Sequence, residues 1–215
     1  MKKIFYTILA ISAIACGSES SKSTTEPTQK PIDTSCVYSY ISDSTKFQWT
    51  AYKTTEKIPV SGSFNEINVS TDSNINVHTI TEAIKSLNFS IPVSSINSNN
   101  PDRDWKVVNI FFAAMDSTQN LTGFVESMDG NENNGSLAIN IKMNNANQKM
   151  NASYAVNGNK LDVVGSFDLL DWQANKAVDS IHETCKDLHT GPDGISKTWS
   201  DIGIAFTIVF NKQCK

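Results

Sequence analysis

Three side chains that can ligate a transition metal lie close together in "HETCKDLH", residues 182–189. His182, Cys185 and His189 are spaced by three and four residues, which places them on one face of a helix. Imidazole and thiolate suit zinc or another transition metal. However, a structural zinc site normally has four ligands, and Cys185 also falls on the apolar stripe of the same helix. The segment therefore predicts either a metal-binding or redox centre, or a buried cysteine beside two histidines that bind no metal.

The chain has one arginine, Arg103, and it lies between Asp102 and Asp104. A guanidinium group presents a planar fork of donors that fits a carboxylate or the carbonyl groups of a loop. We therefore expect Arg103 and Asp104 to form a structural clamp. The alternative is that Arg103 contacts the head group of a ligand at the mouth of a cavity, because a single arginine can bind a phosphate.

Charge and motifs argue against two broad functions. The formal net charge is −4, and it becomes −6 when Lys2 and Lys3 are removed with a signal peptide (−4 minus two positive charges). Nucleic-acid binding draws much of its affinity from lysine and arginine on phosphates, so an acidic chain with one arginine is a poor candidate. The sequence contains no G-x-S-x-G, phosphate-binding loop or dinucleotide fingerprint. We expect a protein that is not an enzyme and that needs no cofactor.

The first residues, "MKKIFYTILAISAIAC", have the layout of a secretory signal: two lysines, a short apolar run and small residues before Cys16. The end of this segment, "AIAC", resembles a bacterial lipobox, although Ala13 stands where that motif prefers leucine. We expect residues 1–15 to be a signal peptide, Cys16 to be lipidated, and residues 16–35, which are polar, to form a disordered tether. This predicts export across the inner membrane and a lipid anchor in the cell envelope, facing the periplasm or the cell surface. Ordinary cleavage with an unmodified Cys16 is the alternative.

From residue 36 onward the apolar residues alternate with a period of two, which is typical of strands. The clearest stretch is "IGIAFTIVF" near the C-terminus, and "KFQWTAY" and "SLNFSI" show the same pattern. Asn157 and Gly158 accept the positive φ of a tight hairpin turn. Only two short stretches look helical, around residues 80–87 and 171–188. We therefore expect residues 36–215 to form a single all-β domain, an antiparallel barrel or sandwich with one or two short helices.

Four segments, "KFQWTAYKTTEKIPVSGSFNEI", "NFSIPVSSI", "DRDWKVVNIFF" and "LTGFVESM", occur in an order and spacing that resemble the YceI-like family of secreted lipid- or polyisoprenoid-binding proteins. The matching positions are Gly62, Phe64, Arg103, Asp104, and Phe111 or Phe112. The resemblance implies an eight-stranded antiparallel barrel of lipocalin-like shape, whose apolar lumen takes an isoprenoid or similar lipid chain. It brings no catalytic residues. The long segment at residues 172–201 resembles the lipoprotein branch of the family and could cap or reshape the lumen.

On this basis we expect a lipoprotein that binds or carries a hydrophobic, isoprenoid-like chain. The candidate lumen residues are Trp49, Phe64, Phe89, Phe111, Phe112, Met115 and Phe206. Aromatic residues and methionine adapt to an apolar ligand, but each of them could equally belong to a packed core. The rival interpretations are the metal or redox centre at residues 182–189 and a barrel filled by its own side chains. The sequence does not indicate a protein partner.

Besides Cys16, the sequence contains Cys36, Cys185 and Cys214. Disulfides form in exported proteins, and three cysteines allow at most one pair within the chain. In a closed barrel the first and last strands pair with each other, which brings the two ends of the domain together. We therefore expect a disulfide between Cys36 and Cys214.

Overall fold

The computed structural model describes residues 35–41, 44–71 and 77–215, which all fall within one structural unit, Ile32–Lys215. The expected signal peptide at residues 1–15, the lipidated Cys16 and the tether as far as residue 34 lie outside the described residues. Within the part of the chain that is described, no helix has the length and apolar character needed to cross a membrane.

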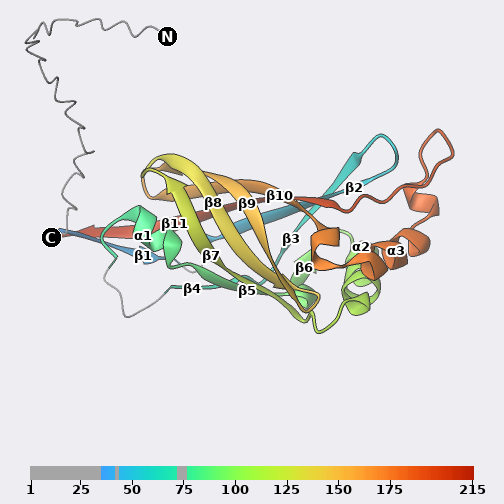
Figure 1. The fold of residues 1–215 in the computed structure, drawn as a ribbon, viewed down its shortest axis with the longest axis horizontal. Helices are drawn as coiled ribbons and strands as arrows, with labels where there is room; N and C mark the ends of the chain where they lie inside the picture. Colours follow the sequence, from blue (N-terminus) through green and yellow to red (C-terminus); the bar gives the residue numbers. More distant parts are fainter. Residues whose placement is uncertain (1–34, 42–43, 72–76) are drawn as a thin grey trace, which may run out of the picture. The chain divides into compact units, whose positions relative to one another are not determined.

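The described residues form one antiparallel sheet of eleven strands. These are β1 (Cys36–Tyr40), β2 (Lys46–Lys53), β3 (Ile58–Phe64), β4 (Asn68–Ser70), β5 (Asn88–Pro92), β6 (Ile96–Asn97), β7 (Asn120–Gly130), β8 (Asn134–Met143), β9 (Ala146–Asn157), β10 (Lys160–Asp168) and β11 (Asp201–Cys214). Hairpins join β7 to β10 in sequence order, and β11 returns beside both β10 and β2. The alternating segments therefore form the strands that their period predicts (Figure 1).

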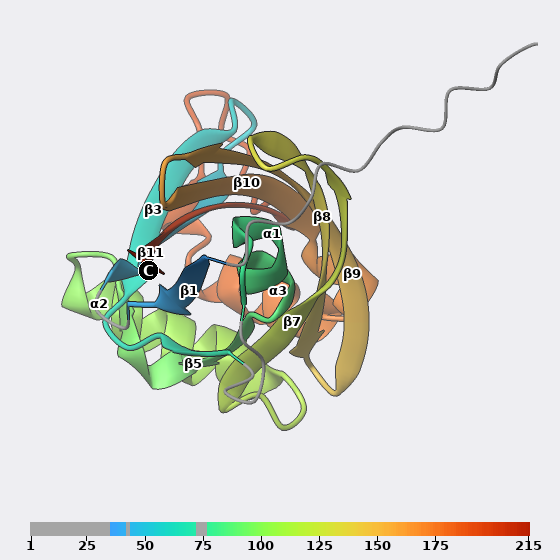
Figure 2. The same ribbon diagram turned by 90° about the vertical axis from the view of Figure 1, so that its left-hand side faces the viewer.

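Three pairs of short strands are bent halves of longer strands, and they close the sheet into a barrel. Both β1 and β2 pair with β11, one after the other along its length. Likewise β3 pairs with β6, and β4 pairs with β5, so the bent strand β3–β4 runs antiparallel to the bent strand β5–β6. At the bend between them, the backbone N–H of Asn65 donates to the carbonyl of Ser95 at 2.7 Å. The structure therefore confirms the expected antiparallel, lipocalin-like fold (Figure 2), but the sheet has eleven strands rather than the expected eight, because three of the long strands are interrupted by bends.

The helical segments lie at the two ends of the barrel. They are α1 (Ile80–Lys85), α2 (Pro101–Lys106), α3 (Asn175–Thr184), the π-helix η3 (Val107–Phe111), and the 3₁₀ turns η2 (Val93–Ser95), η4 (Phe112–Ala114), η5 (Leu169–Trp172) and η6 (Asp187–His189). Helices α1 and α3 confirm the two expected ones. The run from α2 to η4 was not expected from the sequence. Its start has a clear cause, since the side chain of Asn100 accepts from the N–H of Arg103 at 3.0 Å and Pro101 occupies the first helical position.

Helix α1 closes one end of the barrel. A capping box fixes its start, because the Thr79 hydroxyl accepts from the N–H of Glu82 while the Glu82 carboxylate accepts from the N–H of Thr79. Its apolar side chains Ile80, Ala83 and Ile84 are buried. Figure 2 shows α1 across the near end of the ring of strands, beside β1.

Below α1 the lumen is filled by side chains of the barrel itself. The inward residues of β8, β9, β10 and β11 form this core: Leu137, Ile139, Met150, Leu161, Val163, Ile208 and Phe210, each at most 3% exposed. Close packing of this kind stabilises the fold and leaves no space for a ligand at this end.

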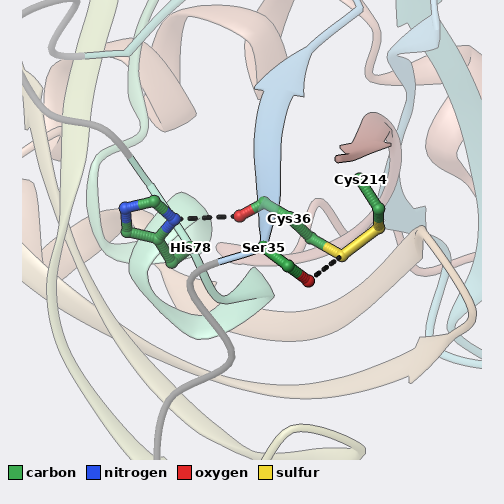
Figure 3. The surroundings of a disulfide bond; sticks show 4 residues. All are labelled: Ser35, Cys36, His78 and Cys214. Atoms are coloured by element: carbon green, nitrogen blue, oxygen red, sulfur yellow. Dashed lines mark hydrogen bonds between the residues drawn. A yellow bond between two sulfur atoms is a disulfide. The ribbon is translucent and has the colours of Figure 1, made fainter.

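A disulfide joins Cys36 to Cys214, which are direct partners in the register of β1 and β11. This is the pairing expected from the meeting of the first and last strands. Figure 3 shows the bond together with the backbone carbonyl of Cys36, which is 2.9 Å from Nδ1 of His78 just before α1. The same strand is tied to this region by the N–H of Tyr38, which donates to the carbonyl of Val77. The ends of the domain and α1 are thus held as one assembly.

The disulfide closes a loop with a sequence separation of 178 residues, so its removal should enlarge the conformational freedom of the unfolded chain considerably. We expect the double variant Cys36→Ser, Cys214→Ser to lose about 3–5 kcal/mol of unfolding free energy, measured by urea denaturation. Reduced wild-type protein is the matched control and should lose a similar amount. Peptide mapping without reduction should recover a Cys36–Cys214 peptide, and a Cys185–Cys214 peptide would contradict the pairing.

Candidate functional site

A cavity of about 340 Å³ lies at the opposite end of the barrel from the disulfide, under the cap formed by α2, η3, α3 and η6. Its walls are the inward faces of β2, β3 and β11 on one side and these helical segments on the other. Along β11 the change from cavity to core is direct: Ile202 and Ile204 line the cavity, whereas Ile208 and Phe210 belong to the filled half of the lumen. The barrel is therefore filled at one end and hollow at the other.

Strand β2 supplies much of the apolar wall. Phe47, Trp49 and Ala51 alternate along one face of the strand, and all three line the cavity. Trp49 pairs with Gly62 on β3, where a Cβ atom would lie 2.4 Å from the indole ring. The absence of a side chain at Gly62 therefore makes room for the indole against β3. The indole N–H donates to the carbonyl of Ser63 at 3.3 Å, which satisfies its polar atom.

The helical wall comes from segments whose packing the sequence did not reveal. Val107 and Phe111 of the π-helix face the cavity, and the rings of Phe111 and Phe112 meet edge to face with centroids 5.0 Å apart. Val178 and Ile181 of α3 complete this side. Single π turns occur often at functional sites, because the wider turn displaces side chains from the regular helical position.

The sequence candidates divide between cavity and core. Trp49, Phe64, Phe111 and Phe112 line the cavity. Phe89, Met115 and Phe206 do not, and they pack in the surrounding core. For Phe89 the cause is local, since its ring lies over Gly123, where a Cβ atom would be 2.4 Å away. The apolar stripe of residues 177–185 was a signal for a buried helix face, but only the structure shows that this face closes the cavity.

The polar end of the cavity corrects the expected role of Arg103. The two neighbouring carboxylates already have other partners: Asp104 accepts from the N–H and hydroxyl of Ser98 at 2.9 and 2.5 Å, and Asp102 binds Lys106 at 2.7 Å. The clamp is thus formed by Asp104 and Ser98 rather than by Arg103. Within the described ranges the guanidinium group has no ion pair or hydrogen bond, and the side chain of Arg103 lines the cavity.

The two histidines of "HETCKDLH" converge on a threonine. Nδ1 of His182 lies 3.1 Å and Nδ1 of His189 lies 2.6 Å from the hydroxyl of Thr198. Cys185 is buried and lines the cavity. Among the described residues no group of three or more His, Cys, Asp or Glu side chains is arranged to hold a metal ion. The spacing in sequence therefore does not become a ligand set in space.

Burial also determines the protonation of this region. It lowers the pKa of His189 to about 4, with smaller contributions from the positive charge of Lys53 and from His182. Burial likewise raises the pKa of the Cys185 thiol. A neutral imidazole and a protonated thiol suit the wall of an apolar cavity, whereas a reactive cysteine requires a lowered pKa.

Comparison with known proteins gives a family and a fold. The model of the YceI-like domain matches residues 38–210. Among solved structures, a polyisoprenoid-binding domain from Saccharophagus degradans, implicated in plant cell wall breakdown, is 9% identical, with a TM-score of 0.55 over 83% of this chain and 99% of that one. A mutant YceI protein of Campylobacter jejuni with a monobromobimane guest is 15% identical, with a TM-score of 0.51 over 73% of this chain and 86% of that one. No curated protein matches in sequence.

The lowered pKa of His189 predicts a loss of stability in acid. The unfolded ring titrates near its ordinary value of 6.5 and the folded ring at about 4, so between these values the unfolded state binds more protons. The stabilisation is therefore complete above about pH 6.5 and is lost as the pH falls toward 4, by about 1–3 kcal/mol in urea unfolding. The variant His189→Asn, which can still hydrogen-bond Thr198, should lack this part of the acid dependence. If the unfolding free energy of the variant depends on pH as in the wild type, the loss of stability in acid arises from other groups.

Proposed function

The chain belongs to the family of YceI-like domains, and we propose that it binds a hydrophobic chain in the cavity under the helical cap. The observation that carries this proposal is the contrast between the two halves of one lumen. Large side chains fill the half near α1, whereas mainly apolar walls line an open cavity of about 340 Å³ in the other. This volume is at the lower end of the roughly 300–1,000 Å³ of small-molecule sites.

Burial of apolar surface is sufficient to drive such binding. A ligand that buries roughly 300 Å² of apolar area would gain about 7 kcal/mol before the cost of association. Few directional contacts are needed, so the protein would discriminate between hydrophobic ligands mainly by their size and shape. The Saccharophagus degradans domain is described as polyisoprenoid-binding, which supports an isoprenoid-like chain as one ligand class for this fold.

The two rival functions find less support. A barrel filled by its own side chains would have no cavity of this size. A metal or redox centre would use Cys185 and the neighbouring histidines, yet the thiol pKa is raised and both imidazoles are engaged by Thr198. We therefore propose a binding protein rather than an enzyme.

We further propose that the chain is exported and anchored in the cell envelope through lipidated Cys16. The sequence before Cys16 supports this, and so does the Cys36–Cys214 disulfide, because disulfides persist in oxidising compartments. In cell fractionation the wild type should remain with the membranes, and Cys16→Ala should move to the soluble fraction of the cell envelope. Equal membrane retention of both proteins would rule out a lipid anchor at Cys16.

Substitution of a large side chain into the cavity wall should weaken ligand binding. Val60 on β3 lines the cavity opposite Ala51, so Val60→Trp places an indole in the space that the ligand would use. We expect at least about tenfold weaker binding of an apolar fluorescent probe, and loss of co-purifying lipid in native mass spectrometry. The matched control is Val164→Trp on the outside of β10, where the wild-type side chain is 58% exposed. Equal binding by both variants would place the ligand elsewhere.

A further inference from the structure

Arg103 is the only arginine of the chain, and its charge is not neutralised by the protein residues that the structure describes. The flanking carboxylates are used by Ser98 and Lys106, as described above. Arg103 is half-buried as a residue and lines a mainly apolar cavity without a protein partner for its charge. Such an arrangement favours a ligand that brings an anionic group to this position.

Positive charge predominates at the end of the cavity where Arg103 lies. Lys53, Arg103 and Lys106 line the cavity together with one carboxylate, that of Asp102, which leaves an excess of two positive charges. The charges of Lys106 and Asp102 cancel within their ion pair, so Lys53 and Arg103 supply the excess. Lys53 donates to the carbonyl of Leu188 at 3.2 Å, which holds its ammonium group at the same end.

The opposite end of the cavity limits the length of the ligand. Its floor toward the core is formed by Phe64, which is 8% exposed and whose ring centroid lies 5.7 Å from that of Phe47, the register partner of Phe206. Beyond this floor the lumen is filled by the core, so a chain cannot extend toward α1. The cavity volume of about 340 Å³ is at the lower end of small-molecule sites, which favours a tail of about a dozen carbons over a much longer chain.

From these two observations we propose that the ligand is a short single-chain amphiphile with an anionic head group. Arg103 binds the carboxylate or phosphate of the head, and the tail, linear or isoprenoid, ends at the floor of the cavity. A long polyisoprenoid would have to extend out of the open side of the cavity. This inference rests on the proposed function, since it specifies the ligand class of the same cavity.

The test measures affinity against chain length and head-group charge. Saturated fatty acids of eight to twenty carbons and the corresponding alcohols are titrated into the full mature protein by calorimetry at pH 8, below their micellar concentrations. We expect the Kd of the acids to fall about fourfold for each added methylene group and to level off near twelve carbons. At equal length the acid should bind about tenfold more tightly than the alcohol, or better.

Two variants test the head-group preference and the chain-length limit independently. Arg103→Gln should remove the preference for acids, whereas Lys186→Gln, which removes an exposed positive charge on a residue outside the cavity wall, should retain it. Ala51→Leu adds three carbons to the cavity wall and should shorten the optimum chain by about three carbons. Ala155→Leu makes the same change at an exposed position of β9 and should leave the optimum unchanged.

The outcomes are distinct. Equal affinity for acids and alcohols, or an unchanged preference in Arg103→Gln, would overturn the anionic head group. An affinity that continues to rise up to twenty carbons would overturn the length limit. If no acid, alcohol or apolar probe binds at any length, the proposed function itself fails, and this inference fails with it.

Discussion

Pairing along β11 is the constraint on which the rest of the structure depends. This strand of fourteen residues pairs with β10 on one side and with β1 and β2 on the other, so it joins the first strands of the domain to the last hairpin. Its backbone hydrogen bonds close the ring, and its inward side chains belong to both the cavity and the core. The disulfide at its end adds a covalent bond to the same pairing. A barrel closed in this way leaves few unpaired edges, and these are short.

The lumen is filled at one end and hollow at the other because different side chains enter it from the two ends. At the end near the disulfide, α1 inserts Ile80 and Ile84, and the strands supply large aliphatic side chains that pack without space. At the other end the side chains of the cap, among them Phe111 and Ile181, line the cavity instead of filling it. An apolar cavity costs packing energy, because its walls lack partner atoms on one side. Burial of a hydrophobic ligand offsets this cost, which is the physical basis for a binding function.

At the polar end of the cavity, the two aspartates beside Arg103 bind other residues instead of the guanidinium group. Two aspartates surround the single arginine in sequence, yet the helical turn at residues 100–106 directs each carboxylate elsewhere. Asp104 binds Ser98 across the bend before α2, and Asp102 binds Lys106 one helical turn later. The guanidinium group is therefore left facing the cavity. The residue that was expected to act as a clamp therefore lines the cavity, because the backbone is helical there.

The all-β class, the main strands and the approach of Cys36 to Cys214 could be predicted from the sequence, and the resemblance to the YceI-like family implied the barrel. These features follow from alternation with a period of two and from the order of the motifs, both of which are local or linear properties of the chain. The tertiary structure decided which inward residues face empty space: Trp49 and Phe111 line the cavity, whereas Phe206 packs in the core, although all three belong to equally apolar stretches. It also brought both histidines of residues 182–189 to the hydroxyl of Thr198. Both outcomes depend on how segments distant in sequence pack against each other, and periodicity within one segment carries no information about that packing.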